Sequence, residues 1–291
     1  MEEIRTNKKI SVSDDKDPIT FAHMKTYDTP ESHMLHLNNY VEVYIFVSGD
    51  ATYIVGDKYY ELEPGDVLVI TPHEVHVPVI KNECVYERYY LLFPLNTFSE
   101  FLYNPLASFI VGDGKRSAML CRSKENRERI SIILSELDSL LKDDISDNSE
   151  LAAYSLMLRL VCLLNDGFSS SPGGQYADHN TSTPDIIRNV LLYINDQAGC
   201  ISTVSDISER FHISLPYLSS VFKKYIGVTA GDYLRTKKIA LAKKLLEGGN
   251  TVTYTCYECG FSDCSYFIRT FKKYVGITPN KYRNKYIRID K

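Results

Sequence analysis

The chain is 291 residues long with 44% apolar and 24% charged residues, which is enough length and apolar content for two folded domains. No apolar run approaches the roughly 18 residues of a membrane-spanning helix and no signal-peptide core is present, so we expect a cytoplasmic protein with no membrane partner. The net charge of −4 is divided unevenly, because residues 184–291 carry 17 Lys and Arg against 9 Asp and Glu, whereas residues 1–183 carry 16 against 28. A basic C-terminal third on an acidic body favours a nucleic-acid partner.

The N-terminal part is predicted to be rich in β-strands. Residues 1–17 are polar and charged and predict a flexible arm. Runs of β-branched and aromatic residues then alternate with turns that contain Gly or Pro, and the runs lie at 40–47, 51–55, 58–62 and 67–70. Short strands at such even spacing predict a small all-β barrel or sandwich, which we place at residues 18–120.

The hydrophobic period becomes helical after this part. Apolar residues recur at spacings of three and four from Lys124 to Asn165, which predicts helices there. We assign residues 121–166 to a helical dimerisation segment and the Ser-, Gly- and Pro-rich residues 167–183 to a flexible linker. Further helices are predicted at 186–198, 203–210, 214–225, 231–247, 252–259, 263–274 and 279–286.

The C-terminal part contains one helix-turn-helix pattern twice, at residues 201–229 and 251–278. The end of the first unit, Phe222-Lys223-Lys224-Tyr225-x-Gly227-x-Thr229, repeats as Phe271-Lys272-Lys273-Tyr274-x-Gly276-x-Thr278. The stretch 233–246 between them predicts one amphipathic helix, which would fix the distance between the two units. Two reading units at a fixed distance suit double-stranded DNA better than a small molecule.

Each unit carries the residues expected around a capped second helix. Ser214 is placed to cap that helix in the first unit, and Ser262 or Asp263 in the second. Gly260 is predicted to end the preceding helix in a left-handed conformation. The side chains expected to face inward are Leu218, Val221, Phe222, Phe267, Ile268 and Phe271.

A dense set of motifs lies between Ile201 and Arg283. It comprises Ser214-x-x-Tyr217-Leu218-x-x-x-Phe222-Lys223, Tyr233-Leu234 and Gly260-Phe261-x-Asp263-x-Ser265-Tyr266-Phe267-x-Arg269-x-Phe271-Lys272-Lys273-Tyr274-x-Gly276-x-Thr278-Pro279-x-x-Tyr282-Arg283. This stretch resembles the DNA-binding domain of the AraC/XylS family of bacterial transcription regulators. The resemblance implies two recognition helices, near 215–225 and 263–274, that enter successive major-groove segments on one face of DNA. Cys256, Cys259 and Ser208 depart from the small residues usual in the family, and we expect them to change packing rather than role.

The resemblance also implies that exposed residues near the start of each recognition helix face bases, and that lysines further along contact phosphate. The implied DNA-binding residues are Pro216, Tyr217, Ser219, Ser220, Lys223, Lys224, Asp263, Cys264, Ser265, Arg269, Lys272 and Lys273. Among the base-facing residues, Arg269 has the fork that can bind guanine O6 and N7 together. The four lysines are equally well explained as solvated side chains that offset the dipole at a helix C-terminus.

The β-rich part carries a second set of motifs, His36-x-Asn38-x-x-x-Glu42, Gly49, Pro64-Gly65-Asp66 and Pro72-x-x-x-His76. These resemble the cupin barrel, a double-stranded β-helix that often precedes this DNA-binding domain. Metal-binding cupins have a second His where this chain has Asn38, so we predict no metal site and no cofactor. The resemblance implies instead an effector pocket at the barrel mouth, with the candidates His36, Glu42, Tyr44, His76 and Tyr90.

Two other functions remain open from the sequence. A metal-dependent cupin enzyme with an appended helical domain would require a complete metal site, which Asn38 argues against. A DNA repair methyltransferase would require a reactive cysteine cluster, whereas Cys84, Cys121 and Cys162 are scattered along the chain. The pair Cys256-x-x-Cys259 with nearby Cys264 has the spacing of a possible zinc site. No fourth ligand is near, however, so we interpret these cysteines as buried thiols of a hydrophobic core.

We therefore predict an α+β multidomain protein that is not an enzyme, in which a cupin-like β-barrel and a helical segment precede an all-α tandem helix-turn-helix domain at residues 184–291. The family resemblance favours a sequence-specific activator that binds operator or promoter DNA, acts as a homodimer and contacts RNA polymerase. Its effector would be a small molecule such as a carbohydrate. Effector binding would shift the population of states in which the DNA-binding domains can occupy their sites together.

Overall fold

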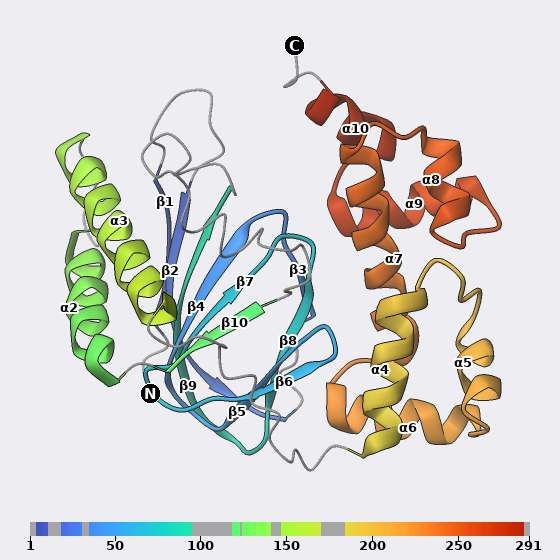
Figure 1. Ribbon diagram of the computed structural model, residues 1–291, viewed down its shortest axis with the longest axis horizontal. Coiled ribbons are helices and arrows are strands. Elements are labelled where there is room, and N and C mark those ends of the chain that lie inside the picture. The colour runs from blue at the N-terminus through green and yellow to red at the C-terminus, as the bar shows by residue number, and fades with distance from the viewer. Residues whose placement is uncertain are drawn as a thin grey trace.

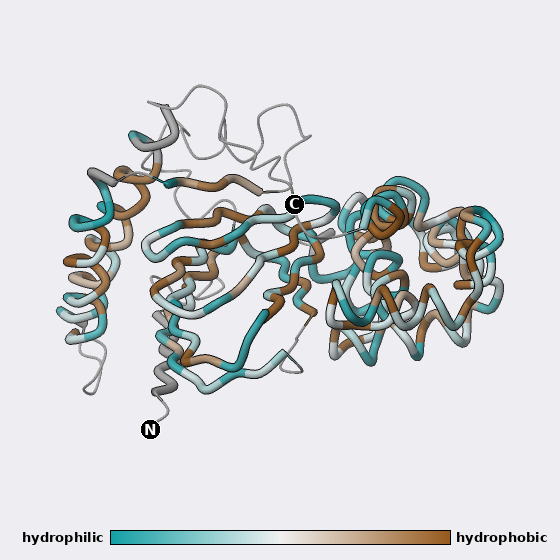
Figure 2. Tube along the Cα trace, turned by 90° about the horizontal axis from the view of Figure 1, so that it is seen from below, coloured by the Kyte–Doolittle hydropathy of each residue, from teal (hydrophilic) through white to brown (hydrophobic). Residues whose placement is uncertain are grey.

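The computed structural model describes residues 4–10, 19–30, 35–94, 118–122, 124–140, 147–169 and 184–287. These residues form a sheet-rich N-terminal part, a pair of helices and a helical C-terminal part (Figure 1). The helix pair lies on one side of the sheets and the C-terminal helices lie on the other (Figure 2). Within these ranges, no helix combines the length and the apolar character that crossing a membrane requires.

The described strands form two antiparallel sheets. The six-stranded sheet has the order β1 (Ile4–Ile10), β2 (Ile19–Asp28), β9 (Cys84–Phe93), β4 (Val41–Ser48), β7 (Val67–Ile70) and β10 (Ala118–Cys121). The four-stranded sheet has the order β3 (His36–Leu37), β8 (Val75–Ile80), β5 (Ala51–Val55) and β6 (Lys58–Glu61). A sheet-rich N-terminal part is therefore confirmed, although no pairing between the described strands closes the two sheets into a barrel.

Strand β4 shows why this part of the sequence is apolar without a clean alternation. Val41, Val43 and Ile45 pack in one core with the helix pair. Tyr44 and Phe46 pack in a second core, between the two sheets. Because both faces of the strand are covered, every residue from Val41 to Phe46 is buried.

Helices α2 (Lys124–Leu140) and α3 (Asp147–Ser169) form where the sequence predicts helices, and they cover the outer face of the six-stranded sheet (Figure 1). The side chains that they bury there are Ile130, Ile133, Leu134, Leu137, Ala153, Tyr154, Met157, Leu160, Val161 and Leu164. Helix α3 continues to Ser169, into the predicted linker at 167–183. The remaining linker residues, 170–183, lie outside the described residues.

Residues 4–10 correct part of the prediction of a flexible arm at residues 1–17. They form β1, which pairs with β2 from Ile4 opposite Lys25 to Ile10 opposite Ile19. The sequence gives little sign of this strand, because backbone hydrogen bonds to β2 form it and its side chains show no apolar period. The rest of the predicted arm lies outside the described residues.

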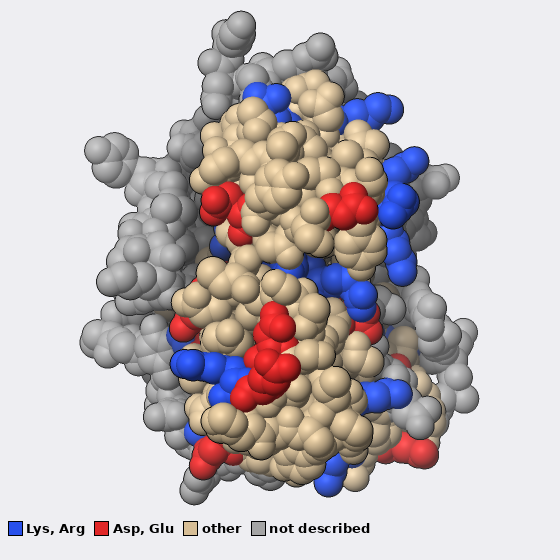
Figure 3. Space-filling model, turned by 90° about the vertical axis from the view of Figure 1, so that its right-hand side faces the viewer, with Lys and Arg blue, Asp and Glu red and all other residues tan. Residues whose placement is uncertain are grey.

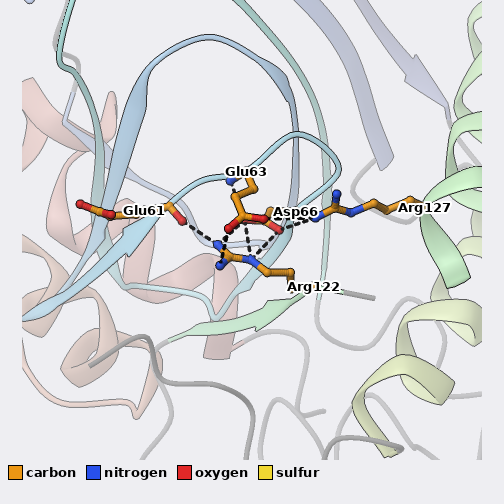
Figure 4. A network of polar contacts seen from close by, with 5 residues as sticks. All are labelled: Glu61, Glu63, Asp66, Arg122 and Arg127. Atoms are coloured by element: carbon orange, nitrogen blue, oxygen red, sulfur yellow. Dashed lines mark hydrogen bonds and ion pairs between the residues drawn. The ribbon is translucent and has the colours of Figure 1, made fainter. Parts of the chain in front are cut away.

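A buried carboxylate joins the sheets to the helix pair. Asp66 is fully buried and accepts hydrogen bonds from Arg122, at 3.0 Å from Nε and 2.7 Å from Nη2. Arg127 of α2 points toward the same carboxylate, with 3.5 Å between Nη2 and Oδ1 (Figure 4). Arg122 also donates to the carbonyl oxygen of Glu61 at 2.7 Å. Two guanidinium groups thus compensate the buried charge and tie the turn before β7 to α2.

The described C-terminal residues form seven helices, and each begins and ends within one residue of its predicted bounds. They are α4 (Asp185–Gln197), α5 (Val204–Arg210), α6 (Leu215–Ile226), α7 (Ala230–Glu247), α8 (Val252–Glu258), α9 (Cys264–Val275) and α10 (Pro279–Ile287). Helix α7 belongs to two cores. Tyr233 and Leu234 pack with α4, α5 and α6, whereas Ile239, Ala242 and Leu246 pack with α8, α9 and α10. This one helix therefore fixes the separation of the two helix-turn-helix units.

The four-stranded sheet packs directly against the C-terminal helices. The sheet residues in this shared core are Ile54, Tyr59, Val75 and Val77. Tyr233 of α7 is buried in the contact, and its hydroxyl donates to the carbonyl oxygen of Gly56 at 2.9 Å. The N-terminal part therefore contacts the helix that joins the two units.

Candidate nucleic-acid interface

Helices α6 and α9 are the second helices of the two units, and a side-chain cap starts each of them. Ser214 Oγ accepts a hydrogen bond from the Tyr217 backbone N at 3.3 Å. Asp263 Oδ1 accepts one from the Ser265 backbone N at 2.6 Å, so Asp263 rather than Ser262 is the cap of α9. Each cap satisfies a backbone N–H group that has no partner inside the helix and so fixes where the helix begins.

The backbone at Gly260, in the second unit, packs closely against the backbone at Gly199, just before the first unit. The φ of Gly260 is 68° and lies in the left-handed region, as predicted. A Cβ atom at this position would lie 2.4 Å from the carbonyl oxygen of Gly199, so the close approach requires glycine. The ammonium group of Lys238 on α7 donates to the carbonyl oxygen of Gly260 at 2.8 Å and lies 5.2 Å from the centroid of the Phe261 ring. A buried cation on α7 therefore stabilises the same turn.

The apolar sides of α6 and α9 face inward as predicted, with one exception. The fully buried side chains are Leu218, Phe222, Phe267 and Phe271. Ile268 was predicted to face inward, but it is 38% exposed, so that prediction is wrong. Phe267, Thr270 and Phe271 take the buried positions of α9 at spacings of three and four, which turns Ile268 away from the core.

The opposite sides of the two helices carry the residues expected to contact DNA. The exposed ones are Pro216, Tyr217, Ser219, Ser220, Lys223, Lys224, Asp263, Ser265, Arg269, Lys272 and Lys273. Cys264 is half-buried, and the carboxylate of Asp263 is engaged in its capping bonds. Both predicted recognition faces are therefore open to solvent, while DNA contact by each of these side chains stays a prediction.

The surface between the two units is hollowed and basic. Lys and Arg side chains gather between the two lobes of this end of the molecule (Figure 3). A hollow of about 290 Å³ lies between α7 and α9 and is lined by Asp232, Arg235, Tyr266, Arg269, Thr270, Lys273 and Tyr274. The sequence prediction includes Arg269 and Lys273 but misses Arg235, because α7 carries no recognition motif and its sequence predicts only a helix that separates the two units.

A second candidate site lies between the two sheets of the N-terminal part. It is a pocket of about 470 Å³ lined by Met24, Thr26, Asp28, His36, Asn38, Glu42, Tyr44, Tyr53, Pro78, Tyr86, Arg88, Tyr90 and Leu92. Four of the five predicted effector residues line it, and His76 does not. His76 lies behind Glu42, with 3.1 Å between Nε2 and Oε2. The sequence prediction misses Asp28 and Arg88, since only the pairing of β2 with β9 brings them to one site.

The pocket contains a buried anion. Burial alone raises the pKa of Glu42, but the neighbouring His76 and the hydrogen bond from Tyr53 bring it below its usual value, so the carboxylate is ionised. The amide of Asn38 donates to Glu42 Oε2 at 2.6 Å. Burial, together with His76, lowers the pKa of His36 to about 4, so this imidazole is neutral at pH 7. Asn38 therefore acts as a hydrogen-bond donor to the carboxylate.

Arg88 adds a cation to the same pocket. Its guanidinium carbon lies 4.3 Å from the centroid of the Tyr86 ring, and Nη1 donates to Thr26 Oγ1 at 2.7 Å. The same nitrogen lies 3.5 Å from Asp28 Oδ2. The pocket thus combines aromatic rings with charged groups of both signs and an amide.

The described His and Cys residues do not form a metal centre. No group of three or more His, Cys, Asp or Glu side chains within the described ranges is placed to hold an ion. Cys256 and Cys259 are buried, and burial raises the pKa of both thiols to about 12. These two residues are thiols of the core formed by α7 to α10.

Known proteins similar to this chain include transcription regulators. The family model described as a helix-turn-helix domain matches residues 207–285. The HTH-type transcriptional activator RhaR of Pectobacterium atrosepticum is 24% identical over 259 residues, which cover 88% of this chain and 88% of RhaR. The multiple antibiotic resistance protein MarA of Escherichia coli is 34% identical over 98 residues, which cover 33% of this chain and 77% of MarA. The crystal structure of the C-terminal domain of the response regulator yesN from Fusobacterium nucleatum covers 34% of this chain and 99% of that domain, at 35% identity and a TM-score of 0.32.

The geometry and the relatives agree on the class of protein. Two capped helices, α6 and α9, present exposed faces from one rigid connecting helix, and the matching family model covers both of them. The chain belongs to the AraC family of transcription regulators, and its C-terminal helices form the helix-turn-helix DNA-binding domain of that family.

Proposed function

We propose that this protein is a sequence-specific transcription activator that binds operator or promoter DNA and responds to a small effector. The observation that carries the proposal is the packing of the pocket-lining sheet against α7, the helix that joins the two recognition units. The relative RhaR is named a transcriptional activator, which supports activation rather than repression. An activator at a promoter works in the cytoplasm and meets RNA polymerase there.

The recognition faces of α6 and α9 would occupy successive major-groove segments of one duplex. In this arrangement, Tyr217 and the serines of α6 reach base edges in one segment, and Arg269 reaches them in the other. The lysine pairs near the ends of both helices contact phosphate and supply affinity without sequence preference. The exposure of these side chains on one continuous helical part supports this assignment.

The chemistry of the pocket supports a carbohydrate as the effector class. Its tyrosine rings offer apolar faces to the C–H groups of a sugar. The carboxylate of Glu42, the guanidinium of Arg88 and the amide of Asn38 can each bind hydroxyl groups. The volume of about 470 Å³ lies in the range of small-molecule pockets. We assign residues 18–120 to a cupin-like effector-binding domain, which the two facing antiparallel sheets support.

A short chain of polar contacts links the pocket to the second recognition unit. The carbonyl oxygen of Asn38, a pocket residue, accepts a hydrogen bond from the His73 backbone N at 2.8 Å. His73 Nε2 lies 2.9 Å from Oε2 of Glu247 at the end of α7. The adjacent Asn39 donates to the hydroxyl of Tyr282 on α10 at 3.0 Å, and Tyr282 in turn donates to Glu247. An effector that displaces Asn38 therefore displaces the end of α7 and shifts the population of DNA-binding states.

Glu74 adds a second link between the same parts. Its carboxylate lies 3.5 Å from Nζ of Lys237 and 3.7 Å from Nζ of Lys244, both on α7. The imidazole of His76 contacts the carbonyl oxygen of Glu74 at 2.8 Å and, on its other side, lies against Glu42 of the pocket. Glu74, just before β8, therefore contacts α7, and His76 of β8 contacts the pocket residue Glu42.

The helix pair supplies the surface for a homodimer. Its inner face covers the sheet, whereas Ile132 on α2 is 49% exposed and Leu151 on α3 is 70% exposed. We assign residues 121–166 to dimerisation, residues 167–183 to the linker and residues 184–291 to DNA binding. Two copies joined through α2 and α3 would present four recognition helices to one operator.

The proposed function is tested by selecting bound sequences from a random pool of duplexes with the full-length protein. We expect one enriched motif with two contacted segments about one helical turn apart. Panels of neutral sugars, sugar acids and amino sugars are then compared by thermal shift, where a ligand raises the melting temperature of the wild type but not of Glu42→Gln. A protein that enriches no sequence, at low salt and with these compounds present, would refute the proposal.

The coupling is tested with Glu247→Gln, which keeps the size of the side chain but removes its charge beside His73. Operator affinity is measured with and without the sugar that stabilises the protein most. We expect the ratio of the two affinities to fall toward 1 in Glu247→Gln. In the control Glu209→Gln, an exposed residue of α5, the ratio should stay at the wild-type value. An unchanged ratio in Glu247→Gln would show that this path does not transmit the signal.

A further inference from the structure

Arg235 is a cation of α7 that lies outside both cores. Its neighbours Leu234 and Thr236 are buried, whereas its own side chain is 38% exposed. Nη2 of Arg235 donates to Asp232 Oδ1 at 2.9 Å, and Tyr266 and Tyr274 of α9 line the same hollow as Arg235. The bond to Asp232 therefore orients the guanidinium beside these α9 residues, and this orientation reduces the entropy lost when it binds a ligand.

The hollow around Arg235 has an excess of positive charge. Three of its lining residues, Arg235, Arg269 and Lys273, are cations, and Asp232 is the one carboxylate among them. That carboxylate also accepts a hydrogen bond from Thr229 Oγ1 at 2.7 Å at the start of α7. The lining therefore keeps two uncompensated positive charges, together with tyrosine hydroxyls. A phosphate group has the charge and the several acceptor oxygens that match such a site.

The hollow lies between the two recognition units. Tyr233 and Leu234, next to Arg235, pack in the core of the first unit. Tyr266 and Tyr274, which line the hollow together with Arg235, belong to α9 of the second unit. DNA that places successive major-groove segments on α6 and α9 turns the intervening minor groove, with its two rows of phosphates, toward this position.

We propose that this hollow binds a DNA backbone phosphate beside the minor groove between the two recognised segments, with Arg235 as its main ligand and Lys273 beside it. The inference rests on the proposed binding of DNA by α6 and α9. It makes α7 a third DNA-contacting element in addition to the connection between the units. A free phosphate presents the same oxygens, and the experiments below distinguish the two sources.

The first experiment compares full-length Arg235→Gln with a matched control. Arg188 on α4 is also 38% exposed and also pairs with an aspartate three residues away, Asp185 at 3.5 Å. We expect Arg235→Gln to bind the selected operator and random duplexes roughly 10-fold more weakly, with a salt-dependence slope smaller by about one. Arg188→Gln should match the wild type in both measurements. Arg235→Lys should keep the salt slope but lose part of the affinity, because an ammonium group lacks the fork of Arg.

The second experiment locates the phosphate. Single phosphates of the operator are replaced one at a time by neutral methylphosphonates, and binding is measured for the wild type and for Arg235→Gln. Replacement of one phosphate between the two recognised segments should weaken DNA binding by the wild type. The loss should be about as large as the loss that Arg235→Gln causes on the unmodified operator. The same replacement should have no further effect on Arg235→Gln. A scan of the wild type alone still decides the matter if the melting temperature shows that Arg235→Gln does not fold.

The outcomes separate this inference from the proposed function. A wild type that binds no duplex would overturn both. Equal affinity and equal salt slope for the wild type and Arg235→Gln on the operator would overturn the phosphate site and leave DNA binding intact. Inorganic phosphate that binds without DNA in an Arg235-dependent manner, combined with a methylphosphonate scan that finds no sensitive position, would identify a free-phosphate site and overturn the DNA assignment.

Discussion

Arg269 and Lys272 lie close together on α9 and are both exposed, yet their loss should have different consequences. We expect Arg269→Ala to lose about 1–3 kcal/mol of preference at one base pair, because a bidentate contact to guanine distinguishes bases. Lys272→Ala should weaken operator and random DNA alike and reduce the salt slope by about one. Titrations on the operator, its single-base variants and a scrambled duplex check both. Equal losses for Arg269→Ala on operator and scrambled DNA would contradict its role in reading bases.

Two glycines in the left-handed region should differ in how much they tolerate alanine. Gly260 has φ 68° and Gly276 has φ 85°, so a Cβ costs roughly 1–2 kcal/mol of backbone strain at either. At Gly276 no atom lies within 4 Å of the added Cβ, whereas at Gly260 the carbonyl oxygen of Gly199 lies 2.4 Å away. Urea unfolding should therefore show a loss of about 1 kcal/mol for Gly276→Ala and roughly 3 kcal/mol or more for Gly260→Ala. Similar losses at the two positions would mean that the contact with Gly199 relaxes at little cost.

At the scale of elements, the stability of the contact between α2 and the six-stranded sheet should depend on pH because of one histidine. His23 on β2 lies 2.9 Å from Glu87 and 2.8 Å from Asp138 of α2. Burial alone lowers the pKa of His23, but hydrogen bonds and charges from Asp138 and Glu87 more than offset this, so the pKa is raised above 6.5. The resulting stabilisation is complete below the unfolded-state pKa and is lost as the pH rises through the higher folded-state pKa.

We therefore expect the melting temperature to fall as the pH is raised above 6.5 through the folded-state pKa of His23, relative to His23→Gln. Thermal unfolding of both proteins at closely spaced pH values measures the difference. Parallel curves for the wild type and His23→Gln would show that the ion pairs of His23 contribute nothing to stability.

The elements differ in how far the sequence predicts them. The C-terminal helices were predicted to within one residue, because caps, terminal glycines and apolar periods agree at each of them. Strands β5 and β7 have the predicted bounds, since turns containing Gly or Pro flank them. Strand β1 was missed because pairing with β2 determines it, and pairing is a property of two distant segments.

The candidate sites follow the same rule. His36, Glu42, Tyr44 and Tyr90 were predicted because motifs mark them or because they stand in apolar strands. Arg88 was missed, since its place in the pocket depends on the register of β9 against β2 and β4. The sequence misses Arg235 for a similar reason, because the hollow that it lines together with Tyr266 and Tyr274 lies between two helices that are separate in the sequence. Charged side chains that work through tertiary contacts have no local sequence pattern.

At the scale of the whole molecule, the two parts depend on each other for stability. A fragment of residues 184–291 lacks the sheet residues that share a core with α4, α6 and α7, and Tyr233 loses its bond to Gly56. We expect the fragment to bind the operator with a lower melting temperature than the full chain and without any response to the effector. Thermal unfolding and operator titrations with added sugar measure both. A fragment that still responds to the effector would place the effector site outside the N-terminal part.

The length of α7 also fixes a rotational phase. The helix has 18 residues, and an α-helix turns by about 100° and rises by about 1.5 Å with each residue. One residue inserted between Tyr233 and Leu246 would therefore turn α9 away from the side of the duplex on which α6 lies. Because B-DNA has a fixed pitch of its own, natural targets of this protein should all share a single spacing between their two contacted segments.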